Sequence, residues 1–501
     1  MSTLTDIFFK NAERFPDKTA IWCDGAAATY GEFGKMFLQI TNMLLANGVK
    51  QGDVIGVPMN NSVESAAMFF AAAEMGAALA PINPTLPAAA VDSTFGSVGV
   101  THIIARKNFF RNYRPEGMTC FCLDSDEPEG AVPFGTYPEF PAERVAYPVS
   151  DDSTLILTLT SGSTGEPKPI ELSQKNKIDR AFAHRDVFHL TSEDRVLAAT
   201  PLYHSLAERL VIMPMLLGAT AILMPRFTPE LWLKCIEEQR VTFSIPVSAQ
   251  LASVLKILEV GNAPDTSTLR CVVSSSALLE QSIKEKLIEK LHCQFHEMYG
   301  TSETSTATDI NFTAVPEKNG SVGSAFWKAE LKIADDNGKE LPCGEVGEIL
   351  VKSPLSFKGY YRLPEKTAES YDEDGFFKTG DLGRLDGDGY LYFCGRKKEL
   401  IITGAVNVYP PDIENVIIKI DGVKEVAAFA YPDDRLGEAV AVAVVREEGS
   451  VLTKRDIQRH CVRNLADFQQ PHHVFFLDEL PKNAMGKIVK GKLMDAVGQI
   501  D

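Results

Sequence analysis

The chain has 501 residues, enough for two or three domains, and its 45% hydrophobic and 23% charged residues are typical of globular proteins. Its 67 acidic and 50 basic residues give a formal net charge of -17, which argues against a general nucleic-acid-binding protein but leaves room for a local positive pocket. The 9 cysteines form no CxxC pair and no zinc-ligand spacing, and the N-terminus shows no secretion signal, so we expect a cytoplasmic protein.

Strand-like and helical patterns alternate through the first half of the sequence. Apolar residues at helical spacing predict a helix over 31–48 that ends at Gly48. The further elements expected in chain order are a strand at 53–59, a helix at 62–76, strands at 77–82 and 196–202, a helix near 205–217, a strand at 219–225, a helix at 229–240, strands at 241–247 and 267–276, and a helix at 280–292. This alternation predicts a mostly parallel sheet with helices on its faces.

Two long apolar runs, 66–84 and 210–225, are interrupted by glycine and proline, so they do not predict membrane spans. The pattern changes after about Gly323, where short alternating runs and turns predict β-hairpins. From about Lys398 the pattern is that of a small α+β domain of about a hundred residues. We therefore expect an α/β protein with a large N-terminal domain at 1–397, which includes a β-rich subdomain, and a small mobile domain at 398–501, with a hinge at about 398.

A run rich in glycine and hydroxyl residues, LTSGSTGEPKPIEL, lies at 159–172 directly after a strand-like segment. Glycines let backbone N–H groups turn toward a ligand and hydroxyls add donors, so such a run at a strand end can bind phosphate. Lys168 would then place positive charge near the outer phosphates. The run does not have the Walker A spacing, and a Ser/Gly run alone is more often a surface turn.

Further motifs decide between these alternatives. TSGSTGEPK resembles the phosphate loop of the adenylate-forming superfamily, which contains acyl-CoA synthetases, peptide-synthetase adenylation domains and firefly luciferase. The other motifs of that family follow in family order: TYGEF at 29–33, PLYH at 201–204, SSSALL at 274–279, MYGTSET at 298–304, KTGDLG at 378–383, GRKKELIITGAVNVYPPDIE at 395–414 and PKNAMGK at 481–487. The resemblance covers essentially the whole chain and is closest to carboxylic acid–CoA ligases.

The resemblance implies a site for ATP or AMP. Its expected residues are Thr160, Ser161, Gly162, Ser163, Thr164, Gly165, Lys168, Ser276, Ala277, Tyr299, Gly300, Thr301, Ser302, Asp381 and Arg396. Tyr299 would stack on adenine, Ser302 would donate to the α-phosphate, and Asp381 would accept hydrogen bonds from both ribose hydroxyls. Each of these residues alone has a commoner structural role, and only the matched motifs favour the functional one.

The resemblance also implies catalytic, acyl-binding and thiol-binding residues. The expected catalytic residues are Lys487, Glu303, which would hold Mg²⁺, and His204, which could accept a proton or orient a carboxylate. The expected acyl pocket contains Tyr203, His204, Ser274 and Ser275, and the expected hinge and thiol channel contain Lys398, Gly404 and Asn407. The acid is left open between a medium-length and an aromatic-like one, and Arg209 is the one basic candidate for a second carboxylate.

Three positions depart from the family pattern. Ser302 stands where the family usually has threonine, which keeps the hydroxyl, and three serines at 274–276 replace a turn that is often rich in glycine and alanine. Pro169 stands where a glycine usually follows the loop lysine. Proline fixes φ and removes an N–H, so we expect altered loop mobility and not lost binding.

The implied reaction uses ATP, Mg²⁺ and a thiol, most simply that of CoA, to convert a carboxylic acid to an acyl adenylate and then to a thioester. One alternative is an adenylation enzyme that loads the acid onto the phosphopantetheine arm of an acyl carrier protein. Another is a non-catalytic nucleotide-binding protein that keeps the fold. No nucleic-acid partner is expected.

Overall fold

The structure is a computed structural model that describes residues 2–125, 128–160, 168–261, 263–403, 406–433, 435–482 and 488–498. The chain divides by packing into two compact units. Unit 1 comprises Met1–Asn319, Ala325–Glu330 and Lys352–Tyr371, and unit 2 comprises Gly320–Ser324, Leu331–Val351 and Asp372–Asp501. The chain thus leaves unit 1 after residue 319 and returns to it twice, with 325–330 and with 352–371.

One sheet of unit 1 has the strand order β19-β9-β8-β4-β3-β5-β6-β7. Its strands are β3 (Val54–Pro58), β4 (Ala78–Ile82), β5 (His102–Ala105), β6 (Thr119–Cys122), β7 (Val132–Pro133), β8 (Thr154–Thr160), β9 (Lys168–Ser173) and β19 (Gly359–Tyr360). The pairs from β8 to β7 are parallel, whereas β9 runs antiparallel to both β8 and β19. The segment near residue 360 therefore lies beside the strand that begins at Lys168.

The second sheet of unit 1 has the strand order β16-β15-β14-β13-β12-β10-β11-β1-β2. Its strands are β1 (Thr19–Cys23), β2 (Ala26–Thr29), β10 (Arg195–Ala198), β11 (Thr220–Leu223), β12 (Phe243–Ser244), β13 (Cys271–Ser274), β14 (Gln294–Thr301), β15 (Ser305–Asn311) and β16 (Ser324–Ala325). The pairs from β1 to β14 are parallel, and antiparallel pairs occur at β1–β2 and β14–β15. The predicted α/β class with mostly parallel sheets is confirmed, although the strands expected at 196–202, 241–247 and 267–276 are shorter than predicted.

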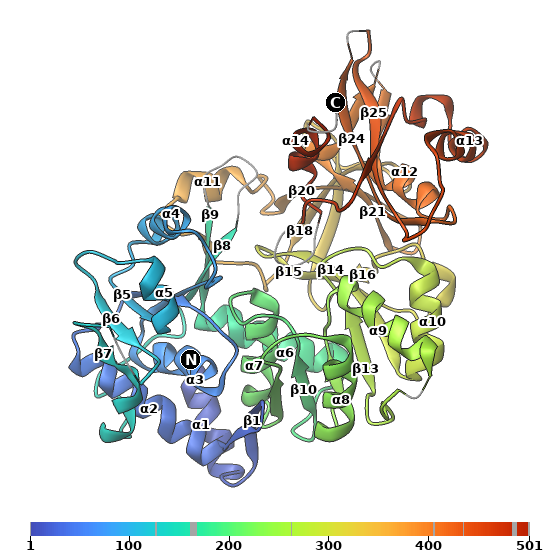
Figure 1. The fold of residues 1–501 in the computed structure, drawn as a ribbon. Coiled ribbons are helices and arrows are strands. Elements are labelled where there is room, and N and C mark those ends of the chain that lie inside the picture. Colours follow the sequence, from blue (N-terminus) through green and yellow to red (C-terminus); the bar gives the residue numbers. More distant parts are fainter. Residues whose placement is uncertain are drawn as a thin grey trace. The chain divides into compact units, whose positions relative to one another are not determined.

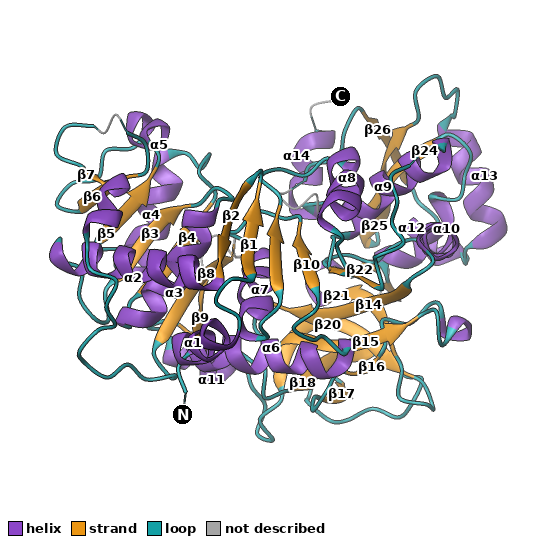
Figure 2. Cartoon of the chain, turned by 90° about the horizontal axis from the view of Figure 1, so that it is seen from below, coloured by secondary structure: helices purple, strands orange, loops and turns teal. Residues whose placement is uncertain are grey.

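Helices surround the strands of unit 1 (Figure 2). They are α1 (Leu4–Arg14), α2 (Tyr30–Ala46), α3 (Val63–Met75), α4 (Ala88–Val98), α5 (Lys107–Asn112), α6 (Gln174–Phe188), α7 (Ser205–Leu216), α8 (Pro229–Gln239), α9 (Ser248–Val260), α10 (Gln281–Leu291) and α11 (Pro364–Glu369), with short 3-10 helices at Phe134–Glu139 and Pro316–Lys318. Helices α6 and α7 lie side by side (Figure 1), and α7 also packs against β10. These two helices carry the charged residues behind the candidate site.

Local sequence explains why α2 forms where it does. Thr29 and Glu32 form a capping box at its N-terminus, which satisfies backbone N–H groups that have no partner within the helix. The apolar face predicted from the spacing is buried, and the rings of Phe33 and Phe37 pack against Phe8 of α1 and Phe70 of α3 with centroid separations of 5.2 to 5.8 Å. The helix predicted over 31–48 is therefore confirmed.

Unit 2 contains two smaller sheets. Their strands are β17 (Glu330–Ala334), β18 (Gly347–Lys352), β20 (Phe377–Leu385) and β21 (Leu391–Arg396) in the order β17-β18-β20-β21, and β22 (Ile401–Thr403), β23 (Val406–Val408), β24 (Val423–Asp433), β25 (Gly437–Arg446) and β26 (His473–Leu477), with β26 beside β25. Its helices are α12 (Pro410–Ile417), α13 (Lys454–Asn464) and α14 (Leu493–Val497), with 3-10 turns at Lys397–Glu399, Asp467–Gln469 and Lys490–Lys492. The hairpins and the α+β segment expected in this half of the chain are present.

Two apolar clusters of unit 2 lie on opposite faces of β24 and β25. Ala428 and Val442 belong to the cluster that includes residues of α12 and α13, whereas Ala427 and Ala441 belong to the cluster that includes residues of α14. Successive side chains of a strand point to opposite faces, so these two continuous apolar strands are buried on both sides. Within the described ranges, no helix is both long and apolar enough to cross a bilayer.

Candidate active site

The strand after the glycine-rich run places Lys168. Residues 161–167, which include Ser161, Gly162, Ser163, Thr164 and Gly165, lie outside the described residues. The run joins the end of β8 to the start of β9, and Thr160 pairs with Lys168 in the antiparallel register. A strand thus follows the run as well as precedes it, whereas a Walker A motif leads from a strand into a helix.

Pro169, the unusual residue after the loop lysine, is part of β9. It lies opposite Leu159 of β8, and its carbonyl accepts a hydrogen bond of 2.8 Å from the backbone N–H of Tyr361. Proline lacks the N–H that glycine would offer at this position, but the carbonyl side of the ladder is intact. The proline is thus the second residue of a paired strand, with its φ fixed, directly after the predicted phosphate lysine.

The YGTSE motif forms the turn between β14 and β15. A Cβ on Gly300 would lie 1.8 Å from the backbone oxygen of Ser305, so only glycine fits at the irregularity in the strand pairing there. Thr301 and Thr304 close the turn: the N–H of Thr304 donates to Thr301 Oγ1 at 3.1 Å and the N–H of Thr301 donates to Thr304 Oγ1 at 3.2 Å. Tyr299 at the end of β14 is half-buried. This rigid turn presents the half-buried Ser302 and Glu303.

Glu303 is held by residues from the 352–371 segment. The phenol of Tyr360 donates to Glu303 Oε1 at 3.0 Å, and the N–H of Phe357 donates to the backbone oxygen of Glu303 at 2.6 Å. Lys168 Nζ lies 5.3 Å from the centroid of the same Tyr360 ring. Burial, together with the Glu303 carboxylate, raises the pKa of Tyr360 well above its usual value, so the phenol stays a donor. The predicted phosphate lysine and the predicted metal carboxylate therefore share one neighbour.

Buried Arg180 of α6 fixes the main chain of the same turn. Its Nε donates to Leu355 O at 2.9 Å, and Nη2 lies 3.4 Å from Ser302 O and 3.5 Å from Glu303 O. Arg180 is 1% exposed. It thus joins α6 both to the turn and to the 352–371 segment.

Arg209 of α7 points into the same buried network. Its Nη1 lies 3.2 Å from His184 Nε2 and 3.3 Å from Thr306 Oγ1, and its Nη2 donates to Ser305 Oγ at 3.3 Å. Burial and the neighbouring Arg209 lower the pKa of His184 well below its ordinary value. His184 Nδ1 lies 2.7 Å from the backbone carbonyl of Arg180, so Nδ1 carries the proton and the neutral Nε2 accepts from Arg209. The guanidinium of Arg209 is therefore engaged inside the protein, which argues against its role as a second-carboxylate ligand.

A buried ion pair completes the network. Lys177 of α6 and Glu208 of α7 are in direct contact, and their side chains are 3% and 1% exposed. Burial lowers the pKa of Lys177 to about 8, while Glu208 opposes this shift. Three cationic side chains, Lys177, Arg180 and Arg209, thus lie behind the turn with Glu208 and Glu303 as the interacting carboxylates.

The predicted acyl residue His204 and the nearby Thr200 each have a buried polar atom without a partner among the described residues. The rings of Tyr203 and His204 lie 4.5 Å apart, and burial lowers the pKa of His204 to about 4, so its imidazole is neutral at pH 7. His204 Nε2 and Thr200 Oγ1 are buried and have no hydrogen-bond partner in the described part of the chain. A neutral imidazole can accept or donate one hydrogen bond, which fits an orienting role.

The serine-rich segment after β13 is tied to the start of α9. Ser248 Oγ lies 3.2 Å from Ser274 Oγ and 3.3 Å from the backbone oxygen of Ser275, and it also donates to Ala277 O. Ser276 has φ +77°, in the left-handed region that favours glycine. Ser276 and Ala277 are exposed, whereas Ser274 is buried. The replacement of a glycine-rich turn by serines is thus accommodated with one unfavourable backbone conformation.

In unit 2, two residues that are predicted to bind the nucleotide lie close together. Asp381 of β20 and Arg396 of β21 are paired across the antiparallel register, and Arg396 Nε lies 3.3 Å from Asp381 Oδ1. Asp381 is buried, whereas Lys398 and Asn407 are exposed. Gly404 and Lys487, predicted for the thiol channel and for catalysis, lie outside the described residues.

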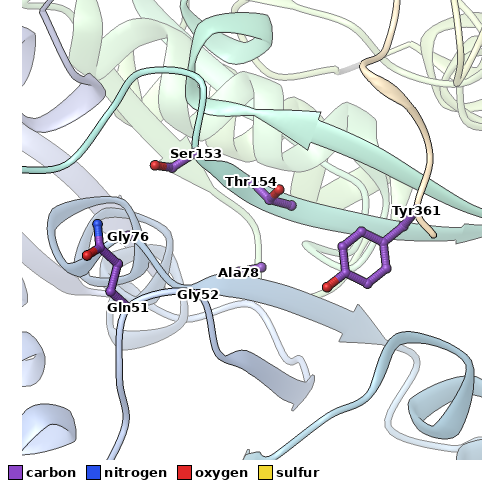
Figure 3. Close-up of a pocket in the computed structure, with 7 residues that line it drawn as sticks. All are labelled: Gln51, Gly52, Gly76, Ala78, Ser153, Thr154 and Tyr361. Carbon is purple, nitrogen blue, oxygen red and sulfur yellow. The ribbon is translucent and has the colours of Figure 1, made fainter.

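One small cavity is lined by none of the predicted site residues (Figure 3). Its volume is about 210 Å³, and it is lined by Gln51, Gly52, Gly76, Ala78, Ser153, Thr154 and Tyr361. Ala78 and Thr154 begin β4 and β8, so the cavity lies at the amino ends of these strands. Ligand sites of α/β proteins gather at the opposite, carboxyl edge, and this cavity is therefore not a candidate for the nucleotide.

Two family models match the chain: the AMP-binding enzyme model over residues 8–361 and the AMP-binding enzyme C-terminal domain model over residues 412–487. The chain belongs to the AMP-binding enzyme family. This membership confirms the predicted family and the predicted ligase class. The roles assigned to single residues and the boundary at about 398 stay predictions.

Relatives of this AMP-binding enzyme align along its whole length. The feruloyl-CoA synthase of Amycolatopsis sp is 31% identical over 98% of this chain and 98% of the relative. The indoleacetate–CoA ligase of Aromatoleum aromaticum is 31% identical over 99% of this chain and 98% of the relative. The crystal structure of ATP-bound MatB from Rhodopseudomonas palustris has a TM-score of 0.89 and 28% identity, and the alignment covers 100% of both chains.

Sequence reasoning missed three residues of this site: Arg180, His184 and Tyr360. Each acts through a partner far along the chain, and the hydrogen bond between Tyr360 and Glu303 spans 57 residues. A charged residue inside the α6 pattern was the one available signal, because Lys177, Arg180 and His184 fall at the spacing of one helix face. Nothing in the local sequence identifies Tyr360.

Proposed function

We propose that this AMP-binding enzyme couples a carboxylic acid to ATP and then transfers the acyl group to the thiol of CoA. The products are an acyl-CoA thioester, AMP and pyrophosphate. The observation that carries this proposal is the alignment of the whole chain with acid–CoA ligases, in a protein whose turn at Glu303 and strand at Lys168 share one neighbour. A cytoplasmic location is part of the proposal and fits the cysteine content.

The residues present suit ATP bound as its magnesium complex. Among the described residues there is no group of three or more His, Cys, Asp and Glu side chains that could hold a metal ion by themselves. Mg²⁺ commonly takes one or two carboxylates together with substrate phosphates and water, so Glu303 alone is a sufficient protein ligand. The ion would neutralise charge on the phosphate oxygens.

The first step forms the acyl adenylate. A carboxylate oxygen of the acid attacks the α-phosphorus, the bond to the bridging oxygen breaks, and pyrophosphate leaves with the electron pair. Lys168 would hold the outer phosphates, Ser302 would donate to the α-phosphate, and Lys487 would stabilise charge at the bridging oxygen. Asp381 and Arg396 would bind the ribose. Catalysis would then rest on positioning and on charge.

The second step forms the thioester. The thiol sulfur attacks the carbonyl carbon, the thiol proton goes to solvent, and AMP leaves with the electron pair of the broken acyl–phosphate bond. We propose that the segment from about 398 carries Lys487 away after the first step and that Gly404 and Asn407 then line the thiol's path. Lys398 would be the hinge.

We further propose that the acid carries a single charge and is aromatic or of medium length. Arg209, the basic residue nearest to PLYH in the sequence, is engaged by His184, Ser305 and Thr306. His204 is neutral at pH 7, so neither residue offers a free positive charge to a second carboxylate. The feruloyl and indoleacetate substrates in the relatives' names agree with this class.

A panel of acids tests this proposal. Pyrophosphate release is measured with ATP, Mg²⁺ and aryl-propenoic, aryl-acetic, medium-chain and dicarboxylic acids, and AMP release is then measured with CoA or with a phosphopantetheinylated carrier protein. We expect the aromatic or medium-chain monocarboxylic acids and CoA to give the highest rates. Preference for the carrier protein would select the alternative loading reaction. If none of the acids in the panel led to pyrophosphate release, the alternative of a non-catalytic nucleotide-binding protein would be favoured.

Lys487→Ala separates the two steps. We expect pyrophosphate release to fall by at least about 100-fold, because a charge at the reacting phosphate is lost. Thioester formation from a supplied acyl adenylate should continue at a similar rate. Lys492→Ala, an exposed lysine nearby, is the matched control. An equal loss in both steps would contradict the movement of Lys487 between them.

A further inference from the structure

Tyr360 contacts both groups that are predicted to hold the ATP phosphates and their metal ion. Its phenol donates to Glu303 Oε1 at 3.0 Å, and the Lys168 ammonium lies 5.3 Å from its ring centroid. The first contact is a hydrogen bond to a charged group, and the second is within cation–π distance. The motifs that carry the family resemblance do not include this residue, although the AMP-binding enzyme model spans it.

The backbone around Tyr360 fixes where its ring can be. Tyr360 pairs with Ile170 of β9, two residues after Lys168, and its N–H donates to Thr367 Oγ1 at 2.9 Å. The ring is 7% exposed and meets Phe357 edge-to-face at 5.0 Å. A phenol held in this way has little freedom to leave the carboxylate that it contacts.

The opposite side of the same turn is held by Arg180, which donates to Leu355 O and approaches the Ser302 and Glu303 carbonyls. The main chain of Glu303 is therefore fixed from α6, and its carboxylate is fixed from β19. A glutamate side chain otherwise has several rotamers, and holding one of them in place is the work of such neighbours.

We propose that Tyr360 is a positioning residue that orients the Glu303 carboxylate toward Mg²⁺ and aligns Lys168 with the phosphates, so that both charges are in place before ATP binds. This inference rests on the proposed function. Its consequence is that loss of the phenol oxygen changes the response to Mg²⁺, and loss of the whole ring also changes the response to ATP.

Three tyrosine variants test this. Tyr360→Phe removes only the hydroxyl and keeps the ring beneath Lys168, and Tyr360→Leu removes both. Tyr361→Phe is the matched control, because Tyr361 follows β19 and lines the separate cavity of Figure 3. Thermal unfolding of each variant is measured first.

The readouts are pyrophosphate release against free Mg²⁺ at saturating ATP and acid, and the KM values for ATP and for the acid. For Tyr360→Phe we expect kcat about tenfold lower and the half-saturating Mg²⁺ concentration about threefold to tenfold higher, with the KM for the acid unchanged. Tyr360→Leu should also raise the KM for ATP. Tyr361→Phe should match the wild type in every readout.

A double variant shows whether the phenol acts through Glu303. In a Glu303→Gln background, Tyr360→Phe should change the rate by less than about twofold, because the charge that it orients is already gone. An effect as large as in the wild-type background would overturn the inference. So would a wild-type Mg²⁺ response in Tyr360→Phe, or a loss of fold in that variant, which would assign the phenol a structural role.

Failure of the proposed function is separable from failure of this inference. If no acid leads the wild type to release pyrophosphate, the proposed function fails. The role of Tyr360 can still be tested in that case, by measuring the affinity for ATP by calorimetry with and without Mg²⁺. We expect Mg²⁺ to strengthen ATP binding more in the wild type and in Tyr361→Phe than in Tyr360→Phe. An equal gain in all three proteins would overturn the inference.

Discussion

Two regions of unit 1 differ in whether their buried polar groups have hydrogen-bond partners within the protein. Behind Glu303, the guanidinium groups of Arg180 and Arg209 donate to carbonyl, imidazole and hydroxyl partners. Near the carboxyl end of β10, Thr200 Oγ1 and His204 Nε2 are buried without a partner among the described residues. An unpaired buried polar group costs about 1–3 kcal/mol. The protein itself therefore supplies the partners of the buried charged residues behind Glu303, the charged framework. At the wall near His204, which consists of Thr200 and His204, we expect a bound molecule to supply them.

The charged framework can be broken at its ion pair. Glu208→Gln leaves the Lys177 ammonium buried without a carboxylate, and we expect the free energy of unfolding to fall by about 3–5 kcal/mol at pH 7. The loss should be smaller at pH 9, because burial already lowers the pKa of Lys177 to about 8 and the lysine can give up its proton there. Urea unfolding at both pH values measures the effect.

The matched control is the exposed pair of Lys234 and Glu238 on α8, whose side chains are 59% and 54% exposed. Glu238→Gln should cost less than about 0.5 kcal/mol, because solvent screens such pairs. Equal costs for Glu208→Gln and Glu238→Gln would contradict a framework that depends on buried charge.

The functional end of the framework is Glu303. Glu303→Gln keeps the shape and still accepts from Tyr360, but it removes the charge offered to Mg²⁺, so we expect pyrophosphate release to fall about 100-fold, or about 2.7 kcal/mol. The exposed Glu317→Gln is the control and should retain wild-type rates. If Glu303→Gln kept more than a third of the activity, the turn would be structural and the metal would be held elsewhere.

The fold was largely predictable because its signals are local. Apolar spacing predicts α2, which the structure confirms with Phe33 and Phe37 buried. The small α+β domain expected from about Lys398 contains β24 and β25, which lie between two apolar clusters. The strand expected at 267–276 covers only Cys271–Ser274, and Ser276, with φ +77°, is in a conformation that cannot extend it. Backbone conformation at a single serine has no signature in the sequence.

The site was predictable only where a motif carried it. Glu303, Asp381 and Lys168 come from matched motifs, and the structure shows what surrounds each of them. Tyr360 and Arg180 were missed, because their roles depend on the pairing of β19 with β9 and on the packing of α6 against the turn. These contacts join residues that are far apart in the chain, and one sequence without relatives contains no record of them.

The burial of His204 can be tested through the pH dependence of the protein's stability. Burial lowers the pKa of His204 to about 4 from an ordinary value near 6.5, so the unfolded chain binds a proton in this window and the folded chain does not. Stability is therefore lost as pH falls from about 6.5 toward 4, and His204→Asn should remove this part of the loss. Between pH 7 and pH 5 we expect the wild type to lose about 2 kcal/mol more than the variant.

Urea unfolding at both pH values measures this difference. His189→Asn, an exposed histidine in a left-handed conformation that asparagine tolerates, is the control and should keep the wild-type pH response. The same pH loss in His204→Asn as in the wild type would show that the imidazole is hydrated, and the contrast between the two regions would weaken.

The smallest effect is expected at Ser276, which lies in the segment tied to α9 by Ser248. Its φ of +77° is unfavourable for a residue with a Cβ, so Ser276→Gly should raise the free energy of unfolding by about 0.5 kcal/mol, the relief of strain exceeding the added freedom of the unfolded chain. Ser275→Gly is the control, because Ser275 has no positive φ, and it should instead cost about 0.5–1 kcal/mol. Opposite signs at these neighbouring positions would locate the strain at one residue of the predicted nucleotide wall. If both variants were destabilised equally, Ser276 would make a contact that stabilises the fold by more than its backbone strain costs. The serine segment would then resemble the framework behind Glu303, where the protein itself supplies the partners of the polar groups.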